Sequence, residues 1–208
     1  MFDFIQDLDA YFCERYANYD TLCGLSGYQM PTMQATKTDD FGRTVAYTLP
    51  SNTMRLALQP NKDELLKSLK EKLLDKTFSF SFRPYGFFEG LKLKFSRYAF
   101  HKHLKAILAK HGITTEDTGK NLAIDTEIWK NIVKGNFEPS KNLILSIALA
   151  EHLTFDETKS LLYSCGFEFD FSIVKDIVVA YLLENKVFNR DMIEAALVEY
   201  KVTNLFLN

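Results

Sequence analysis

Start and stop signals for short helices follow one another closely between residues 113 and 162. A helix over 115–121 leads into a three-residue turn. Asp125 can cap a second helix over 126–134, which Gly135 would end. Two short helices joined by so short a turn must cross steeply and share a core. The positions that would point into this core are all apolar: Leu122, Ile124, Ile128 or Trp129, and Ile132.

Helical signals continue in the same order beyond this pair of helices. Pro139 and Ser140 precede a further helix, because proline is tolerated at a helix start and serine accepts its first free N–H groups. Thr154 and Glu157 have the spacing of a capping box, which predicts another helix after them. The buried faces of these two helices would hold Leu143, Ile144, Ile147, Ala148, Leu161 and Leu162.

The stretch from Ile113 to Leu162 resembles the phage-repressor-like helix-turn-helix family over its five-helix core, without the first helix. This resemblance implies a DNA-binding fold in which the helix over 126–134 enters the major groove. It assigns base and phosphate contacts to four residues of that helix, which are Thr126, Lys130, Asn131 and Lys134.

The run LLYSCGF at 161–167 leads into two last helices, expected to begin near Ser172 and Asn189. Together they resemble a helical module appended to bacterial regulatory or signalling proteins. Their apolar residues at helical spacing are Ile173, Ile177, Tyr181, Met192, Ile193, Ala196, Leu197 and Tyr200.

Several positions depart from the repressor pattern. Gly119 stands where the family has alanine for close helix contact, and it costs about 1 kcal/mol of helix propensity. Val133 replaces an acidic residue, and Glu151 stands where an apolar residue is usual. Asp125 and Glu127 are acids at the helix end that would meet phosphates, which repel them. The alternative interpretation is that this helix face is only the solvated surface of a helical bundle.

Charge is distributed unevenly along the chain. The formal net charge is −2, but residues 62–111 carry 12 basic and 5 acidic side chains. Residues 91–112 contain no acid, and their apolar members lie on one helical stripe, as the first helix of a repressor core requires. This helix could pair with acidic segments of the same chain or of a second copy, or lie on a membrane surface. It could also bind phosphates through Lys92, Lys94, Arg97, Lys102 and Lys105.

The first part of the chain mixes helical and strand signals. Apolar residues at spacings of three and four predict a helix over 2–19. Glycines and prolines then bound a hairpin of 28–36 with 43–49. Asn61 and Glu64 have capping-box spacing at the start of a helix that reaches Asp75.

The boundary between two domains is expected near residues 84–90. Phe78, Phe80 and Phe82 alternate with serines as in a short strand, and Pro84 ends that pattern. We therefore expect a mainly α protein. A small N-terminal α+β part over 1–86 would precede an all-α helix-turn-helix domain over 87–208 with two extra C-terminal helices.

Signatures of catalysis, cofactors and metals are lacking in the sequence. His101, His103 and His111 have no cysteine cluster beside them, and no phosphate loop or activated nucleophile is recognisable. We expect no enzyme, no cofactor and no metal site. An enzyme in residues 1–86 would require a pocket that collects Asp, Arg or Cys side chains.

Two features concern the cellular compartment. The acids Asp3, Asp7 and Asp9 contradict a signal peptide, and no apolar run approaches the roughly 20 residues of a membrane span. Three cysteines in a chain of this size are expected to be reduced thiols. These features predict a cytoplasmic protein without a membrane partner.

The leading hypothesis is a bacterial or phage regulatory protein whose C-terminal domain binds double-stranded DNA. Its N-terminal part would serve for homodimerisation or for sensing a partner. The alternative is an adaptor that uses the same helical fold to bind a protein, which the acids Asp125 and Glu127 favour.

Overall fold

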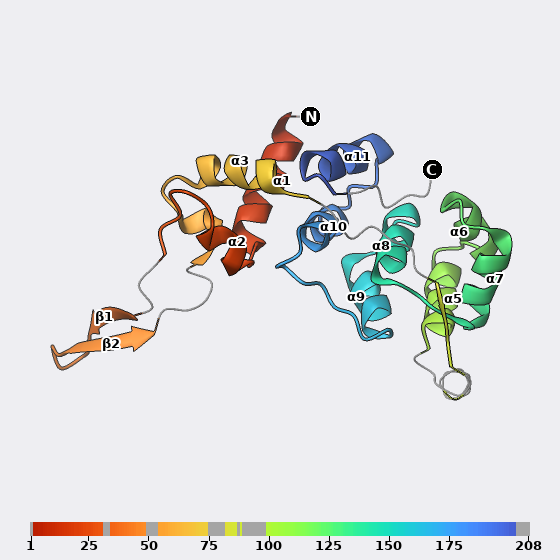
Figure 1. The fold of residues 1–208 in the computed structure, drawn as a ribbon. Coiled ribbons are helices and arrows are strands. Elements are labelled where there is room, and N and C mark those ends of the chain that lie inside the picture. Colours follow the sequence, from red (N-terminus) through yellow and green to blue (C-terminus); the bar gives the residue numbers. More distant parts are fainter. Residues whose placement is uncertain are drawn as a thin grey trace.

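The computed structural model describes residues 2–30, 34–48, 54–74, 82–86, 88 and 99–202. Within them it has ten α-helices and short antiparallel strand pairs, so the expected mainly α class with a small α+β part is confirmed. The N-terminal helices and the predicted helix-turn-helix lie at opposite ends of the molecule (Figure 1). No helix of the described residues is long and apolar enough to span a membrane.

The N-terminal part consists of α1 (Phe2–Arg15), α2 (Tyr19–Cys23), the short 3-10 helix η2 (Leu56–Leu58) and α3 (Lys62–Lys72). The apolar faces of α1 and α3 are buried as predicted, because their apolar residues recur at helical spacing. The single helix predicted over 2–19 instead ends at Arg15. Asn18 starts α2 by accepting a hydrogen bond from Thr21 N at 3.0 Å.

Two details of α3 were predicted wrongly. Asn61 occupies the N-cap position but makes no side-chain cap bond: its Nδ2 donates to Gly27 O at 3.3 Å, and its Oδ1, which would accept a cap bond, has no partner among the described residues. The helix also ends at Lys72 rather than Asp75, and Leu74 lies in solvent instead of on the buried face.

The predicted hairpin is present, but its first strand is shifted. β1 (Gln34–Thr38) pairs antiparallel with β2 (Thr44–Thr48). Residues 28–30 are not a strand. There the Gln59 side chain takes the place of a partner, accepting from Gln29 N and donating to Gln29 O, both at 2.9 Å. The hairpin stands away from the helices in Figure 1.

The C-terminal part contains α5 (Phe100–Lys110), α6 (Thr115–Asn121), α7 (Thr126–Lys134), α8 (Lys141–Ala150), α9 (Phe155–Tyr163), α10 (Val174–Glu184) and α11 (Arg190–Glu199). The bounds of α6 and α7 are those predicted. The side chains of Asp125, Ser140 and Asn189 cap α7, α8 and α11, as the sequence indicated. Ser172 does not cap α10, which begins after an exposed Ile173 without a side-chain cap.

A second short sheet joins the two parts of the chain. β3 (Arg83–Pro84) pairs with β4 (Phe137–Glu138), which lies between α7 and α8. Phe78 and Phe80 of the predicted strand lie outside the described residues. Phe82 precedes β3, and the paired segment reaches Pro84, where the sequence predicted its end.

Two helices form the centre of the fold. Every residue from Leu143 to Leu149 in α8 and from Lys175 to Leu183 in α10 is buried. α1 packs against α10, with the ring centroids of Tyr11 and Tyr181 5.3 Å apart. The buried residues of both parts belong to one cluster. The division at residue 86 stays a prediction, but the described residues on its two sides share a core.

The crossing of α6 and α7 depends on a glycine beside a tryptophan. Trp129 lies against Gly119, where an added Cβ would stand 2.5 Å from Trp129 Cδ1. The indole Nε1 donates to Thr115 O at 2.5 Å, so the ring is fixed across α6. The Trp129 ring thus fills the space that a methyl group at position 119 would need.

This contact predicts the effect of restoring alanine. We expect Gly119→Ala to lower the free energy of unfolding by about 1–3 kcal/mol, since overpacking outweighs the gain in helix propensity. Urea denaturation measures the change. Lys120→Ala, at an exposed neighbour, should leave stability nearly unchanged. A Gly119→Ala protein as stable as the wild type would contradict the close packing.

The capping box predicted at the start of α9 is confirmed and extended. Glu157 N donates to Thr154 Oγ1 at 3.2 Å, and Thr154 N donates to Glu157 Oε2 at 3.0 Å. Lys110 Nζ and His111 Nε2 lie 2.6 and 3.0 Å from the same carboxylate. Partial burial opposes ionisation, but these hydrogen bonds outweigh it and lower the pKa of Glu157 to about 2.

At pH values above the ordinary pKa of a glutamate, the ionised Glu157 carboxylate should therefore stabilise the folded protein. A group with a lowered pKa in the folded protein contributes stability at neutral pH and loses it as the pH falls toward the folded value. We expect Glu157→Gln to be about 1–2 kcal/mol less stable than the wild type at pH 6, with the difference shrinking between pH 4.5 and pH 2. Urea unfolding across this range measures it. Asp156→Asn, at an exposed neighbouring acid, should show no such dependence.

Candidate nucleic-acid interface

Three of the four candidate DNA contacts in α7 face solvent. Thr126, Lys130 and Lys134 are exposed, and Asn131 is half-buried. The Asn131 amide donates to Glu127 O and accepts from Asn136 Nδ2, each at 2.9 Å. Asn131 is therefore committed to the end of its own helix, whereas Lys134 forms no ion pair with any described residue.

The two acids of α7 both have partners. The Asp125 carboxylate accepts from Glu127 N at 2.9 Å and from Ile128 N at 3.1 Å. Glu127 Oε1 lies 2.7 Å from Lys130 Nζ, and this hydrogen bond raises the pKa of Lys130. Of the two acids that would repel DNA phosphates, Asp125 thus caps the helix and Glu127 forms an ion pair.

His101, which the sequence analysis considered only in excluding a metal site, connects α5 to α7. His101 packs against Gly135 at the end of α7, where an added Cβ would stand 2.4 Å from His101 Nδ1. Burial, aided by the positive charges of Lys105 and Lys102, lowers the pKa of His101, so its ring is neutral near pH 7. The spacing of four residues between His101 and Lys105 could have predicted that the two side chains lie on one face of the helix.

This contact brings two predicted lysines to one end of α7. Lys105 follows His101 by one turn of α5, so it lies on the same side as the helix end at Gly135. Lys134 immediately precedes that glycine. Lys102 is exposed farther around α5, and Lys92, Lys94 and Arg97 lie outside the described residues. Lys105 and Lys134 are thus exposed lysines that adjoin the two residues of the His101–Gly135 contact, and they are called the cationic end below.

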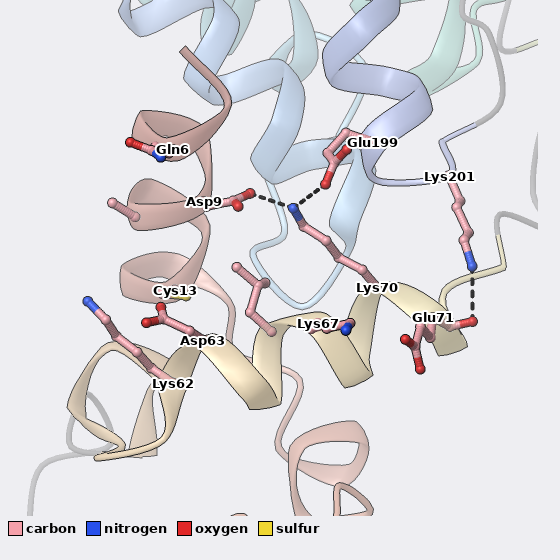
Figure 2. Close-up of a pocket in the computed structure, with 12 residues that line it drawn as sticks. Gln6, Asp9, Cys13, Lys62, Asp63, Lys67, Lys70, Glu71, Glu199 and Lys201 are labelled. Atoms are coloured by element: carbon pink, nitrogen blue, oxygen red, sulfur yellow. Dashed lines mark hydrogen bonds and ion pairs between the residues drawn. The ribbon is translucent and has the colours of Figure 1, made fainter. Parts of the chain in front are cut away.

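A separate polar pocket of about 670 Å³ lies between α1, α3 and α11 (Figure 2). Lys70 Nζ lies 2.7 Å from Asp9 Oδ1 and 2.5 Å from Glu199 Oε1. Asp9 Oδ1 also accepts from the Tyr200 hydroxyl at 2.7 Å. Lys201 Nζ donates to Glu71 O at 3.0 Å on the same side. These contacts tie the N-terminal helices to the last helix of the chain.

The pocket collects Asp and Cys side chains, as an enzyme in residues 1–86 would require. Its cysteine is not an activated nucleophile, because burial, with a smaller effect of Asp9, raises the pKa of Cys13 to about 11. Asp9 is held by Lys70 and Tyr200. The absence of enzymatic activity stays a prediction.

The Lys70 contacts predict a loss of stability on substitution. Lys70→Met keeps the length of the side chain but leaves two carboxylates without their cation. We expect the free energy of unfolding to fall by about 1–3 kcal/mol, between the values for exposed and buried ion pairs. Urea denaturation tests this against Lys67→Met, which removes an exposed lysine of the same helix. Equal effects of both changes would contradict a specific role for Lys70.

Comparisons with known proteins do not assign this site. No family model matches the chain, and searches of curated proteins and of solved structures found no significant match. Among the described residues, no group of three or more His, Cys, Asp or Glu side chains could hold a metal ion. A function must therefore be inferred from the exposed faces and pockets of the chain itself.

Proposed function

We propose that this protein is a regulatory protein that binds double-stranded DNA through α7 and the cationic end formed by Lys105 and Lys134. The observation that carries this proposal is the rigid presentation of α7. Trp129 and Ile132 fix one side of the helix in the core, while Thr126, Lys130 and Lys134 face solvent on the other. A helix held in this way across a preceding short helix is the arrangement of helix-turn-helix DNA readers.

The acids of α7 do not prevent such binding. Asp125 is already solvated by two backbone N–H groups of its own helix. The Lys130–Glu127 pair is formed between exposed side chains, and such pairs contribute little to stability, so Lys130 can exchange Glu127 for a phosphate. Of the other cations, Lys134 ends α7, and Lys105 lies on α5 one turn after His101, which contacts Gly135. Phosphate contacts would therefore come from the last turn of α7 and from α5, and base contacts from Thr126 and Lys130.

This proposal predicts a salt-dependent affinity for random-sequence duplex DNA. Replacing Lys105 and Lys134 by glutamine removes two phosphate contacts. The slope of log K against log salt concentration should then become shallower by roughly 2, since each contact contributes about 0.9. Fluorescence anisotropy of a labelled duplex at several salt concentrations measures both slopes.

The matched control removes two exposed lysines at the other end of the molecule. Lys62→Gln with Lys67→Gln makes the same change of charge on α3, which lies far from α7 in Figure 1. This variant should keep the wild-type slope. Absence of binding at low salt, or equal slopes for both double variants, would overturn the proposal.

An aromatic hollow favours a second candidate function, that of an adaptor for a protein partner. The hollow encloses about 550 Å³ beside α9, and Tyr163 on its rim is 84% exposed. Exposed aromatic side chains next to cations are typical of the central residues of protein interfaces. The lining side chains are Arg15, Phe155, Lys159, Ser160, Tyr163, Phe167, Glu168, Phe169 and Phe171.

Charge reversal separates the two functions. Lys102→Glu with Lys105→Glu should abolish binding of a DNA reader to duplex DNA, because the new acids repel phosphates. If the protein is an adaptor, the charge-reversal variant should still crosslink to the partner protein that crosslinks to the wild type. A Tyr163→Ala variant should lose that crosslink. Retention of DNA affinity after charge reversal would exclude the cationic end as the DNA contact.

A further inference from the structure

The hairpin of β1 and β2 is a strand pair without a packed face. All five residues of β2 are exposed, including Val45 at 41% and Tyr47 at 42% of their full accessible surface. Two strands alone are marginally stable in water and usually need more strands or a covering helix. In Figure 1 the hairpin reaches away from the helices, so its edges are open. The hairpin would therefore be stabilised by a further strand at one of its edges.

The direction of the backbone groups follows from the closing loop. Asp39 N donates to Arg43 O at 2.9 Å, and Gly42 in the left-handed conformation (φ 76°) completes the loop. Hydrogen-bonded and non-bonded pairs alternate along an antiparallel ladder. With Thr38 opposite Thr44 as the first pair after the loop, the N–H and C=O groups of Thr44, Ala46 and Thr48 point outward from β2. They form the free edge of that strand.

The two free edges of the hairpin differ in charge. β1 carries Lys37, and a charged lysine on an edge strand discourages pairing with another strand. β2 reads Thr-Val-Ala-Tyr-Thr and has no charged residue. Within the described residues, the uncharged edge of β2 is therefore the one suited to accept a further strand.

The order of residues in β2 indicates which strand that is. Read in either direction, β2 has threonine at both ends, an apolar side chain next, and Ala46 at the centre. We propose that β2 pairs antiparallel with β2 of a second copy of the chain, about a two-fold axis at Ala46. Thr44 of each copy then lies opposite Thr48 of the other, and Val45 opposite Tyr47. Threonine pairs and aromatic–β-branched pairs are favourable cross-strand neighbours.

This register also uses every outward backbone group of the strand. Thr44, Ala46 and Thr48 are the residues with free edge groups, and all three face one another across the two-fold axis. A register shifted by one residue would place them opposite groups already bonded to β1. The four charged side chains of the hairpin, Lys37, Asp39, Asp40 and Arg43, sum to zero, so two copies do not repel each other.

The resulting contact is small. Two five-residue strands bury well under the roughly 1,200 Å² of a stable interface, so the dimer should form in a concentration-dependent way. The proposal depends on β2 alone and does not rest on DNA binding.

Sedimentation velocity over a range of protein concentrations tests the dimer with a matched pair of proline variants. Ala46→Pro removes an outward N–H of β2 without removing a bond to β1, and proline is tolerated on an edge strand. Thr36→Pro makes the same change at the residue paired with Ala46, on the free edge of β1. We expect the wild type and Thr36→Pro to dimerise equally, and Ala46→Pro to stay monomeric with an unchanged helical circular dichroism spectrum.

Disulfide trapping locates the two-fold axis. In a Cys23→Ser background, which removes the exposed native thiol, Ala46→Cys places two thiols on residues whose Cα atoms face each other about 5.5 Å apart. Mild oxidation should give a covalent dimer with Ala46→Cys and none with Thr36→Cys. A wild type that stays monomeric at all concentrations, equal behaviour of the two proline variants, or crosslinking only through Thr36→Cys would each overturn the proposal.

Discussion

The start of α10 depends on one buried carboxylate. Asp176 is almost completely inaccessible, yet it accepts hydrogen bonds from Lys141 Nζ and, at 2.7 Å, from Asp170 N. Burial raises the pKa of Asp176, while Lys141 and Asp170 N–H favour its ionised form. Because α10 is buried along nearly its whole length and contacts α1, α8, α9 and α11, the packing of both parts of the chain rests on the helix that this group anchors.

Two of the lysines counted in the basic segment are paired with carboxylates within the fold. Lys110 pairs with Glu157, and Lys70 is shared between Asp9 and Glu199. Lys70 is a poor phosphate ligand, because it is largely buried and a phosphate would have to displace two carboxylates at once. The surface available to an anion is therefore narrower than the basic segment suggests. Among the described candidates it is centred where α5 meets the end of α7, and His101 contributes shape there rather than charge.

Local signals could be predicted from the sequence and distant contacts could not. The bounds of α7 follow from Asp125 and Gly135, since capping geometry is decided within a few residues. The Asn61 side chain is not a cap and instead donates to Gly27 O, an acceptor that is remote in sequence. The Lys70 contacts and the pairing of β3 with β4 also join residues that are distant in sequence, so local patterns could not predict them. At the candidate site, the exposed residues of α7 were predictable from helical spacing, whereas the role of Trp129 beside Gly119 required the crossing of two helices.

Under the two proposals, the hairpin and α7 would serve different requirements of a DNA reader. A single helix that offers four candidate DNA contacts, of which Lys130 and Asn131 are already bonded within the protein, can read few base edges, so one copy would bind largely through phosphates. Helix-turn-helix proteins overcome this by two-fold symmetry, which doubles the contacts and fixes the spacing of half-sites. An antiparallel β2 pair has that symmetry by construction. Since the hairpin lies at the opposite end of the molecule from α7, two copies joined there would present widely separated helices, which suits two distant sites better than adjacent half-sites.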